Sequence, residues 1–137
     1  MREHYPHWRR IPTRWGDNDV YGHVNNVVHY ALMDTLINTW LIDSGLDVHA
    51  GAEIGLCVES HCSYRAPVAF PEALDAGLRV GKLGRSSVRY EIGFYREGSD
   101  ELVARGHFVH VFTDRGTRRP VPIPDGLRAA MTGLVVP

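Results

Sequence analysis

A long apolar segment near the N-terminus is the feature that most limits how this chain can fold. Residues 27–43, VVHYALMDTLINTWLID, carry apolar side chains over far more than one stripe of a helix. Asn25 or Asn26 can cap the start of this helix, and Ser44 and Gly45 form a good stop signal. Such a helix needs cover on most of its sides, so we expect the rest of the chain to be built around it.

The sequence after this helix is typical of β-strands. Apolar and polar residues alternate through SVRYEIGFYR, which indicates a strand with one buried face. Turn-forming residues separate the expected strands, which span 54–64, 74–83, 87–96 and 101–113. A further strand is expected within 7–15, before the helix, and a short second helix within 122–131.

One long helix and five strands predict an α+β arrangement, in which an antiparallel sheet curls round the helix. The 137 residues fit one domain, 1–137, because splitting them would leave neither half a sufficient core. The sheet has edges, and the edges of similar strands commonly pair across a two-fold axis. We therefore expect at least a homodimer.

Composition excludes several classes of partner. Fifteen basic and sixteen acidic side chains give a formal net charge of -1, so no broad field favours a nucleic acid or an anionic membrane. No stretch approaches the ~18 apolar residues that span a bilayer, and the N-terminus lacks the apolar core of a secretion signal. Cys57 and Cys62 lie five apart in an expected strand, which predicts opposite faces and no disulfide. We expect a cytoplasmic protein.

Polar residues crowd into the loop before the helix, in RWGDNDVYGHVNNVVHY. The start of a helix exposes unpaired N–H groups and a partial positive charge, which suit a developing oxyanion. Asp19 lies a few residues upstream, where its carboxylate could act as a general base on water or as a direct nucleophile. The expected oxyanion donors are the main-chain amides of Gly22, His23, Val24 and Asn25.

The rest of the sequence limits which compound could react. It has no GxSxG elbow, HExxH motif, CxxC pair or Walker loop, and we expect no cofactor. His107 and His110 lie three apart on an expected strand, so they face opposite ways and are poor candidates for a shared metal. A thioester suits a site with so few catalytic groups, because a thiol with a pKa near ~8.5 leaves as thiolate without prior protonation.

The same loop carries a family resemblance. The sequence resembles hotdog-fold acyl-CoA thioesterases of the 4-hydroxybenzoyl-CoA thioesterase superfamily, whose motif D-x-D-x-x-G-H-V-N-N is present as DNDVYGHVNN. The segments CSYRAPVAFPE, GRSSVRYEIGFY and HVFTDRGTRRPVPIP also resemble that family, so the likeness covers nearly the whole chain. It implies a hotdog fold, a five-stranded antiparallel sheet wrapped round one long central helix. The implied reaction is hydrolysis of an acyl-CoA to the free acid and CoA.

The resemblance also implies roles for single residues of the motif. Asp19 matches the catalytic carboxylate, and Asp17 a loop-shaping acid. His23 matches a histidine of plant acyl-carrier-protein thioesterases, and it could equally hold the shape of the loop. Tyr21 replaces their asparagine, and its hydroxyl could orient a water or simply pack. Asn26 stands where other members place a functional histidine, so it could orient water or substrate, or cap the helix.

Coenzyme A is implied to lie along the sheet surface and a subunit boundary, in a homodimer or homotetramer. Two other functions stay open, a non-catalytic acyl-CoA-binding hotdog module and an acyl-thioester hydratase or dehydratase. The candidate substrate contacts, chosen for their cationic or hydroxyl groups, are Tyr21, Arg65, Lys82, Arg85, Ser86 and Ser87.

Overall fold

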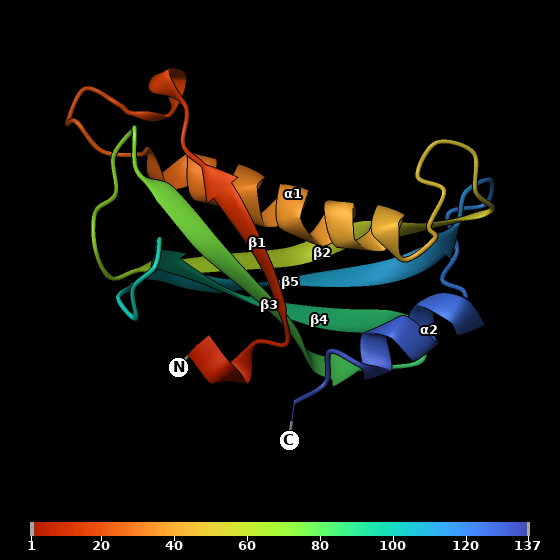
Figure 1. The fold of residues 1–137 in the computed structure, drawn as a ribbon. Helices are drawn as coiled ribbons and strands as arrows, with labels where there is room; N and C mark the ends of the chain where they lie inside the picture. The colour runs from red at the N-terminus through yellow and green to blue at the C-terminus, as the bar shows by residue number, and fades with distance from the viewer. Residues whose placement is uncertain (1, 137) are drawn as a thin grey trace.

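The computed structural model describes residues 2–136, and Figure 1 shows the path of the chain. In chain order the elements are η1 (Arg2–His4), β1 (His7–Pro12), η2 (Trp15–Asp17), α1 (Asn26–Asp43), β2 (Glu53–Tyr64), β3 (Ala73–Leu83), β4 (Ser87–Arg96), β5 (Leu102–Asp114) and α2 (Asp125–Thr132). The expected helices and strands are confirmed to within a few residues. The first strand is shorter than expected, because it ends at Pro12 and the chain then turns into η2.

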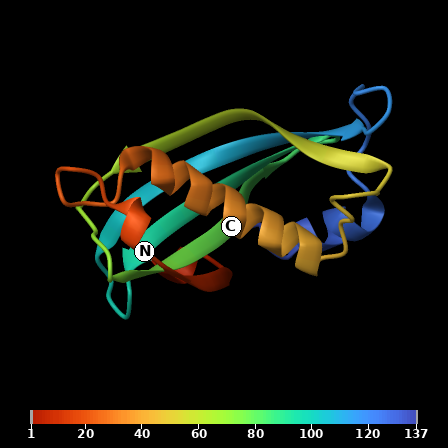
Figure 2. The ribbon, with the colours of Figure 1, turned by 90° about the horizontal axis from the view of Figure 1, so that it is seen from above.

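The strands form one antiparallel sheet in the order β1-β3-β4-β5-β2. The sheet curls, and α1 lies along its inner side, as Figures 1 and 2 show from two directions. The α+β fold class predicted from the sequence is therefore confirmed. β1 and β2 are the two edge strands, so the long strand β2 has one side without a partner strand within this chain.

The start and stop signals of α1 act where the sequence places them. Asn25 is the N-cap, and its side chain accepts a hydrogen bond from the Val27 N–H. The helix ends before Ser44, and Gly45 adopts a φ of 104° that favours glycine. Its fully buried apolar side chains are Met33, Leu36, Ile37 and Leu41. Within residues 2–136, neither helix is long and apolar enough to cross a membrane.

The side of α1 turned away from the sheet is left uncovered by residues 2–136. Val27 is 68% exposed and Ile42 is 50% exposed, although both are apolar. Val58, on the edge strand β2, is 62% exposed. The sequence predicts that most sides of the helix are covered. In the structure, the sheet covers one side of α1, and apolar residues on its other side stay exposed.

A β-bulge overturns the prediction made for the cysteines. The pairing of β2 with β5 shifts between Cys57 and Glu59, because β2 contains one extra residue there. Cys57 therefore pairs with His110, and Cys62 pairs with Gly106. These partners are four residues apart on β5, so both cysteines point to the same face of the sheet, not to opposite faces. Both thiols are free.

Candidate active site

A buried carboxylate holds the shape of the loop between β1 and α1. Asp17 is 1% exposed, and its oxygens accept hydrogen bonds from the N–H, Nε and Nη2 of Arg14 at 2.7, 3.0 and 2.8 Å. The Asp17 carbonyl also accepts a hydrogen bond from the Asn25 N–H at 2.9 Å. Asp17 therefore fixes the loop and joins it to the start of α1.

Asp19 lies in a different environment, although it is only two residues away. Its side chain is half-buried, and Oδ1 accepts a hydrogen bond from the Tyr21 N–H at 2.9 Å. Oδ2 accepts a hydrogen bond from the side-chain amide of Asn25 at 3.1 Å. Asn25 is also the N-cap of α1, so the carboxylate is held beside the first turn of the helix. Both donors are neutral, unlike the arginine that pairs with Asp17.

A hollow of about 300 Å³ lies beside the same helix start. Asp19 does not line the hollow. Asn25 connects Asp19 with the hollow, because its side chain donates a hydrogen bond to Asp19 and the next residue, Asn26, lines the hollow. The Tyr64 hydroxyl donates a hydrogen bond to the Asn26 carbonyl at 3.0 Å, which joins β2 to α1 across the hollow. The lining residues are Val24, Asn26, His29, Tyr64 and residues 65–68.

His29 and Tyr64 belong to this hollow, although the sequence analysis does not single them out. His29 is buried, its Nδ1 lies 3.3 Å from the Asn25 carbonyl oxygen, and its ring meets Tyr64 edge-on at 5.0 Å. Burial lowers the pKa of His29 below its usual value, so the imidazole is neutral at neutral pH. Helical spacing offered a signal, because His29 follows Asn26 by three residues and shares its side of α1.

The structure corrects the predicted oxyanion donors. Three of the four main-chain amides already donate to carbonyl groups, two of them within the loop and one, Val24, to the segment between β2 and β3. The donors and their carbonyl acceptors are Gly22 to Asp19 at 3.0 Å, Val24 to Val68 at 2.7 Å and Asn25 to Asp17 at 2.9 Å. Within residues 2–136, the N–H groups of His23 and Asn26 have no acceptor. Of these two residues, Asn26 also lines the hollow.

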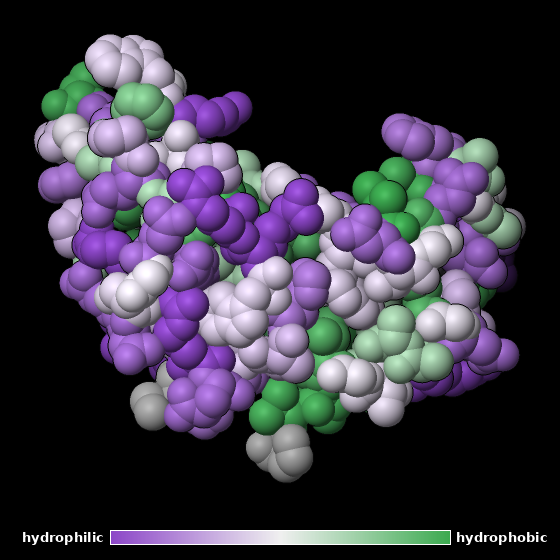
Figure 3. Space-filling model, in the orientation of Figure 1, coloured by the Kyte–Doolittle hydropathy of each residue, from purple (hydrophilic) through white to green (hydrophobic). Residues whose placement is uncertain are grey.

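The tip of the loop projects from the rest of the chain. Tyr21 and His23 are exposed and do not line the hollow. The apolar side chains of Trp15 and Val20 are 84% and 96% exposed. Figure 3 shows pale and green residues at the upper left of the molecule, where Figure 1 places this loop. The loop that carries Asp19 therefore presents largely exposed apolar side chains, although the Trp15 ring meets Phe70 edge-on at 5.9 Å between ring centroids.

The residues predicted to contact coenzyme A fall into two groups. Arg65 lines the hollow. Lys82, Arg85, Ser86 and Ser87 lie around the turn from β3 to β4, which α2 holds through a 3.0 Å hydrogen bond from Arg128 to the Arg85 carbonyl. In the hollow, the ring centroids of His29 and Phe94 are 6.2 Å apart. Phe94 lies seven residues after Ser87 on β4, which places it roughly 23 Å along the strand from the turn. One chain does not bring the two groups together.

The histidines of β5 point to opposite sides of the sheet, as the sequence predicts. His107 lies on the outer face, where its Nε2 is 2.7 Å from a Glu59 carboxylate oxygen. His110 is buried on the inner face, with its ring edge-on to Tyr90 at 5.2 Å. Within residues 2–136, the His110 Nδ1 and the Tyr90 hydroxyl have no hydrogen-bond partner. Desolvation lowers the pKa of His110 to about 4.

Solved structures similar to this chain carry the same fold. The PA5185 protein from Pseudomonas aeruginosa is 55% identical, with a TM-score of 0.96, over 98% of this chain and 94% of that chain. The PA2801 protein from the same organism, described as a candidate thioesterase, is 32% identical, with a TM-score of 0.88, over 93% and 98%. A 1,4-dihydroxy-2-naphthoyl-CoA thioesterase from Synechocystis is 19% identical, with a TM-score of 0.84, over 95% and 98%, and shows the fold alone.

The family assignment comes from the sequence itself. The model of the thioesterase-like superfamily matches residues 13–131, which include the loop, α1 and four of the strands. No curated protein matches the sequence. The match covers most of the chain, so this protein belongs to the thioesterase-like superfamily and is a thioester hydrolase.

Proposed function

We propose that this chain hydrolyses an acyl-CoA thioester to the free acid and CoA, with Asp19 as the group that activates water or attacks the carbonyl carbon. One observation carries the proposal: an unpaired carboxylate is fixed by two neutral donors beside the first turn of the central helix. Asp17 is excluded from this role, because Arg14 occupies its oxygens.

As a general base, Asp19 takes a proton from water while the water oxygen bonds to the thioester carbon. The carbon–sulfur bond of the tetrahedral intermediate then breaks, and the leaving thiolate takes up the proton that Asp19 removed from water. As a nucleophile, Asp19 bonds to the thioester carbon and the carbon–sulfur bond breaks, which releases the CoA thiolate and leaves an anhydride that water then hydrolyses. Both routes use the same carboxylate and release the same two products.

The negative charge on the carbonyl oxygen needs donors, and the corrected set is small. The Asn26 N–H is the first candidate, because it has no acceptor within residues 2–136 and belongs to a residue that lines the hollow. The His23 N–H is the second candidate. Neutral His29 and the Tyr64 ring give the hollow a mainly uncharged wall, which suits the acyl part of the substrate.

A second copy of the chain is part of this proposal. The uncovered apolar residues of α1, of the edge strand β2 and of the projecting loop suit contact with another copy. Such a copy would also approach the exposed Tyr21 and His23, and could bring its own turn from β3 to β4 toward the hollow. We propose a homodimer or homotetramer, with coenzyme A bound at a boundary between subunits.

Thiol release from a panel of thioesters tests the proposal. The panel contains short-chain, long-chain and aromatic acyl-CoAs, with matching acyl-carrier-protein thioesters as a separate arm. At least one acyl-CoA should release free thiol, and Asp19→Asn should lose ~100-fold or more in rate. Cys57 is exposed, so a reaction without substrate corrects for its thiol. Asp43→Asn, at the other end of α1, is the matched control.

Two results would contradict the proposal. Absence of thiol release from every acyl-CoA would favour the non-catalytic binding module, or a hydratase that leaves the thioester intact. Release by Asp19→Asn at the rate of the unchanged chain would remove Asp19 from the reaction.

A further inference from the structure

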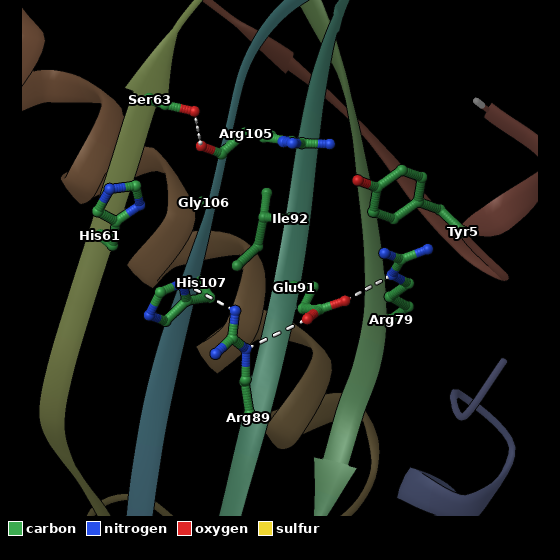
Figure 4. Close-up of a pocket in the computed structure, with 10 residues that line it drawn as sticks. All are labelled: Tyr5, His61, Ser63, Arg79, Arg89, Glu91, Ile92, Arg105, Gly106 and His107. Carbon is green, nitrogen blue, oxygen red and sulfur yellow. Dashed lines mark hydrogen bonds and ion pairs between the residues drawn. The ribbon is translucent and has the colours of Figure 1, made fainter.

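A polar cavity lies on the outer face of the sheet, the side turned away from α1. Its volume is about 400 Å³, and Figure 4 shows its residues standing on the strands with the helix behind them. We call it the outer cavity. The residues that matter for its chemistry are Tyr5, His61, Arg79, Arg89, Glu91 and Arg105.

A chain of hydrogen bonds and ion pairs crosses four strands at this cavity. Glu59 on β2 contacts His107 Nε2 on β5 at 2.7 Å, and His107 Nδ1 contacts Arg89 Nη2 on β4 at 3.3 Å. Glu91 accepts a hydrogen bond from Arg89 Nε at 3.2 Å and one from Arg79 Nε on β3 at 2.8 Å. The two arginines are thus held side by side by one carboxylate.

Glu91 leaves other N–H donors of the two arginines free. Its carboxylate accepts hydrogen bonds from the Nε atoms of Arg79 and Arg89. Within residues 2–136, both terminal nitrogens of Arg79 and the Nη1 of Arg89 have no hydrogen-bond partner. Terminal guanidinium nitrogens held in fixed positions match the oxygens of a phosphate.

Arg105 adds a charge that no carboxylate cancels. Glu59 and Glu91 balance Arg79 and Arg89, whereas no acidic side chain within residues 2–136 pairs with Arg105. Figure 4 places Arg105 at the end of the cavity between His61 and Tyr5. The outer cavity therefore has a net positive charge even when its histidines are neutral.

Two ring faces flank these cations. The Tyr5 ring lies flat over Gly77 and Gly93, where an added Cβ would come within 2.7 and 2.8 Å of its atoms. On the opposite side, the His61 ring stacks on His107 at 5.4 Å and an angle of 18°. Arg79 Cζ lies over the Tyr5 ring, 5.1 Å from its centroid, so a planar group entering the cavity would meet the exposed His61 ring.

We propose that the outer cavity binds a phosphorylated small molecule of about mononucleotide size, with its phosphate on Arg105 and the free nitrogens of Arg79 and Arg89. A planar base would pack against His61. The sheet separates this cavity from the hollow beside α1, so we assign it to a second ligand and not to the thioester being hydrolysed.

Isothermal titration calorimetry of the purified chain with AMP, ribose 5-phosphate and adenosine tests the proposal. AMP and ribose 5-phosphate should bind with saturation, and adenosine should bind at least about 10-fold more weakly than AMP. Arg105→Gln should weaken AMP binding by about 10-fold or more, because it removes a charge-assisted contact. Arg9→Gln is the control: Arg9 pairs with Ala76, whose side chain is in the core, so its side chain faces away from the outer cavity.

Three results would overturn the proposal: no saturable binding of either phosphorylated probe at millimolar concentration, equal affinity for AMP and adenosine, or unchanged AMP binding by Arg105→Gln. If another copy of the chain covers the outer face, the first of these results will be found. The titration needs no hydrolysis, so it can fail while the thioesterase proposal stands, and the reverse is also possible.

Discussion

The helix start beside the hollow and the outer cavity hold their charged groups differently. In the outer cavity, Glu91 pairs with two arginines and Arg105 is left over. Beside the hollow, Asp19 receives hydrogen bonds from neutral groups, and burial keeps His29 uncharged.

This difference suits the outer cavity to ligand binding and the Asp19 site to catalysis. Cations preset by a carboxylate bind an anion without further rearrangement. A lone carboxylate near unpaired main-chain amides can accept a proton and stabilise an oxyanion. We therefore expect that each site can be changed without affecting the other.

Crossed variants should give the largest effects. Asp19→Asn should lower kcat/KM for acyl-CoA hydrolysis by about 100- to 10,000-fold, because the general base or nucleophile is removed. The same variant should bind AMP like the unchanged chain. Arg105→Gln should show the reverse pattern in the same two assays. A loss of both activities in either variant would mean that the two sites are coupled.

Acid should destabilise the fold through His110. Burial lowers its pKa to about 4 in the folded chain, whereas the unfolded value is near 6.5. Above pH 6.5 neither state is protonated. As pH falls from 6.5 to about 4, the unfolded chain binds a proton that the folded chain does not, so the free energy of unfolding falls by about 3 kcal/mol.

Urea unfolding at several pH values measures this loss. His110→Phe should keep the ring shape and flatten the dependence on pH between 6.5 and 4, leaving the smaller contributions of His29 and His7, whose pKa values are also lowered. An unchanged slope in His110→Phe would exclude His110 as its cause.

Asp17→Asn should act on stability more than on chemistry. The change removes a buried charge that accepts three hydrogen bonds from Arg14, so we expect the free energy of unfolding to fall by about 2 kcal/mol. Urea denaturation at neutral pH measures the change. Arg14→Gln, which keeps the Arg14 N–H to Asp17 bond, is the milder comparison, and an unaffected midpoint in Asp17→Asn would contradict the loop-shaping role.

The smallest expected effect is at the hollow. Tyr64→Phe removes the 3.0 Å hydrogen bond to the Asn26 carbonyl and keeps the ring against His29. A stability loss of about 1 kcal/mol should appear in the same urea assay, with kcat/KM reduced by less than about 10-fold. A greater kinetic loss would place the hydroxyl in the reaction itself.

The fold follows from local patterns that a single sequence reveals. The apolar run of 27–43, the Asn25 cap and the alternation in β4 predict elements that the structure contains within a few residues. Pairing details do not follow in the same way, since the bulge after Cys57 depends on the match between β2 and β5. That one inserted residue reverses the predicted facing of the cysteines.

The site was less predictable than the fold for a related reason. Asp17 and Asp19 look alike in sequence, and the motif distinguishes them only through the resemblance. Which main-chain amides are free depends on how the loop closes, so the occupied N–H groups of Gly22 and Val24 could not be foreseen. Tyr64 joins the hollow through a contact between residues 38 apart in the chain, which no local pattern reveals.

The most direct test of the central claim compares the two loop carboxylates as catalysts. We would measure kcat/KM for Asp19→Asn and Asp17→Asn on the best acyl-CoA of the panel, at a temperature where circular dichroism shows both variants folded. A catalytic role for Asp19 predicts a loss of at least about 100-fold for Asp19→Asn and less than about 10-fold for Asp17→Asn. Equal losses, or a larger loss for Asp17→Asn, would contradict it.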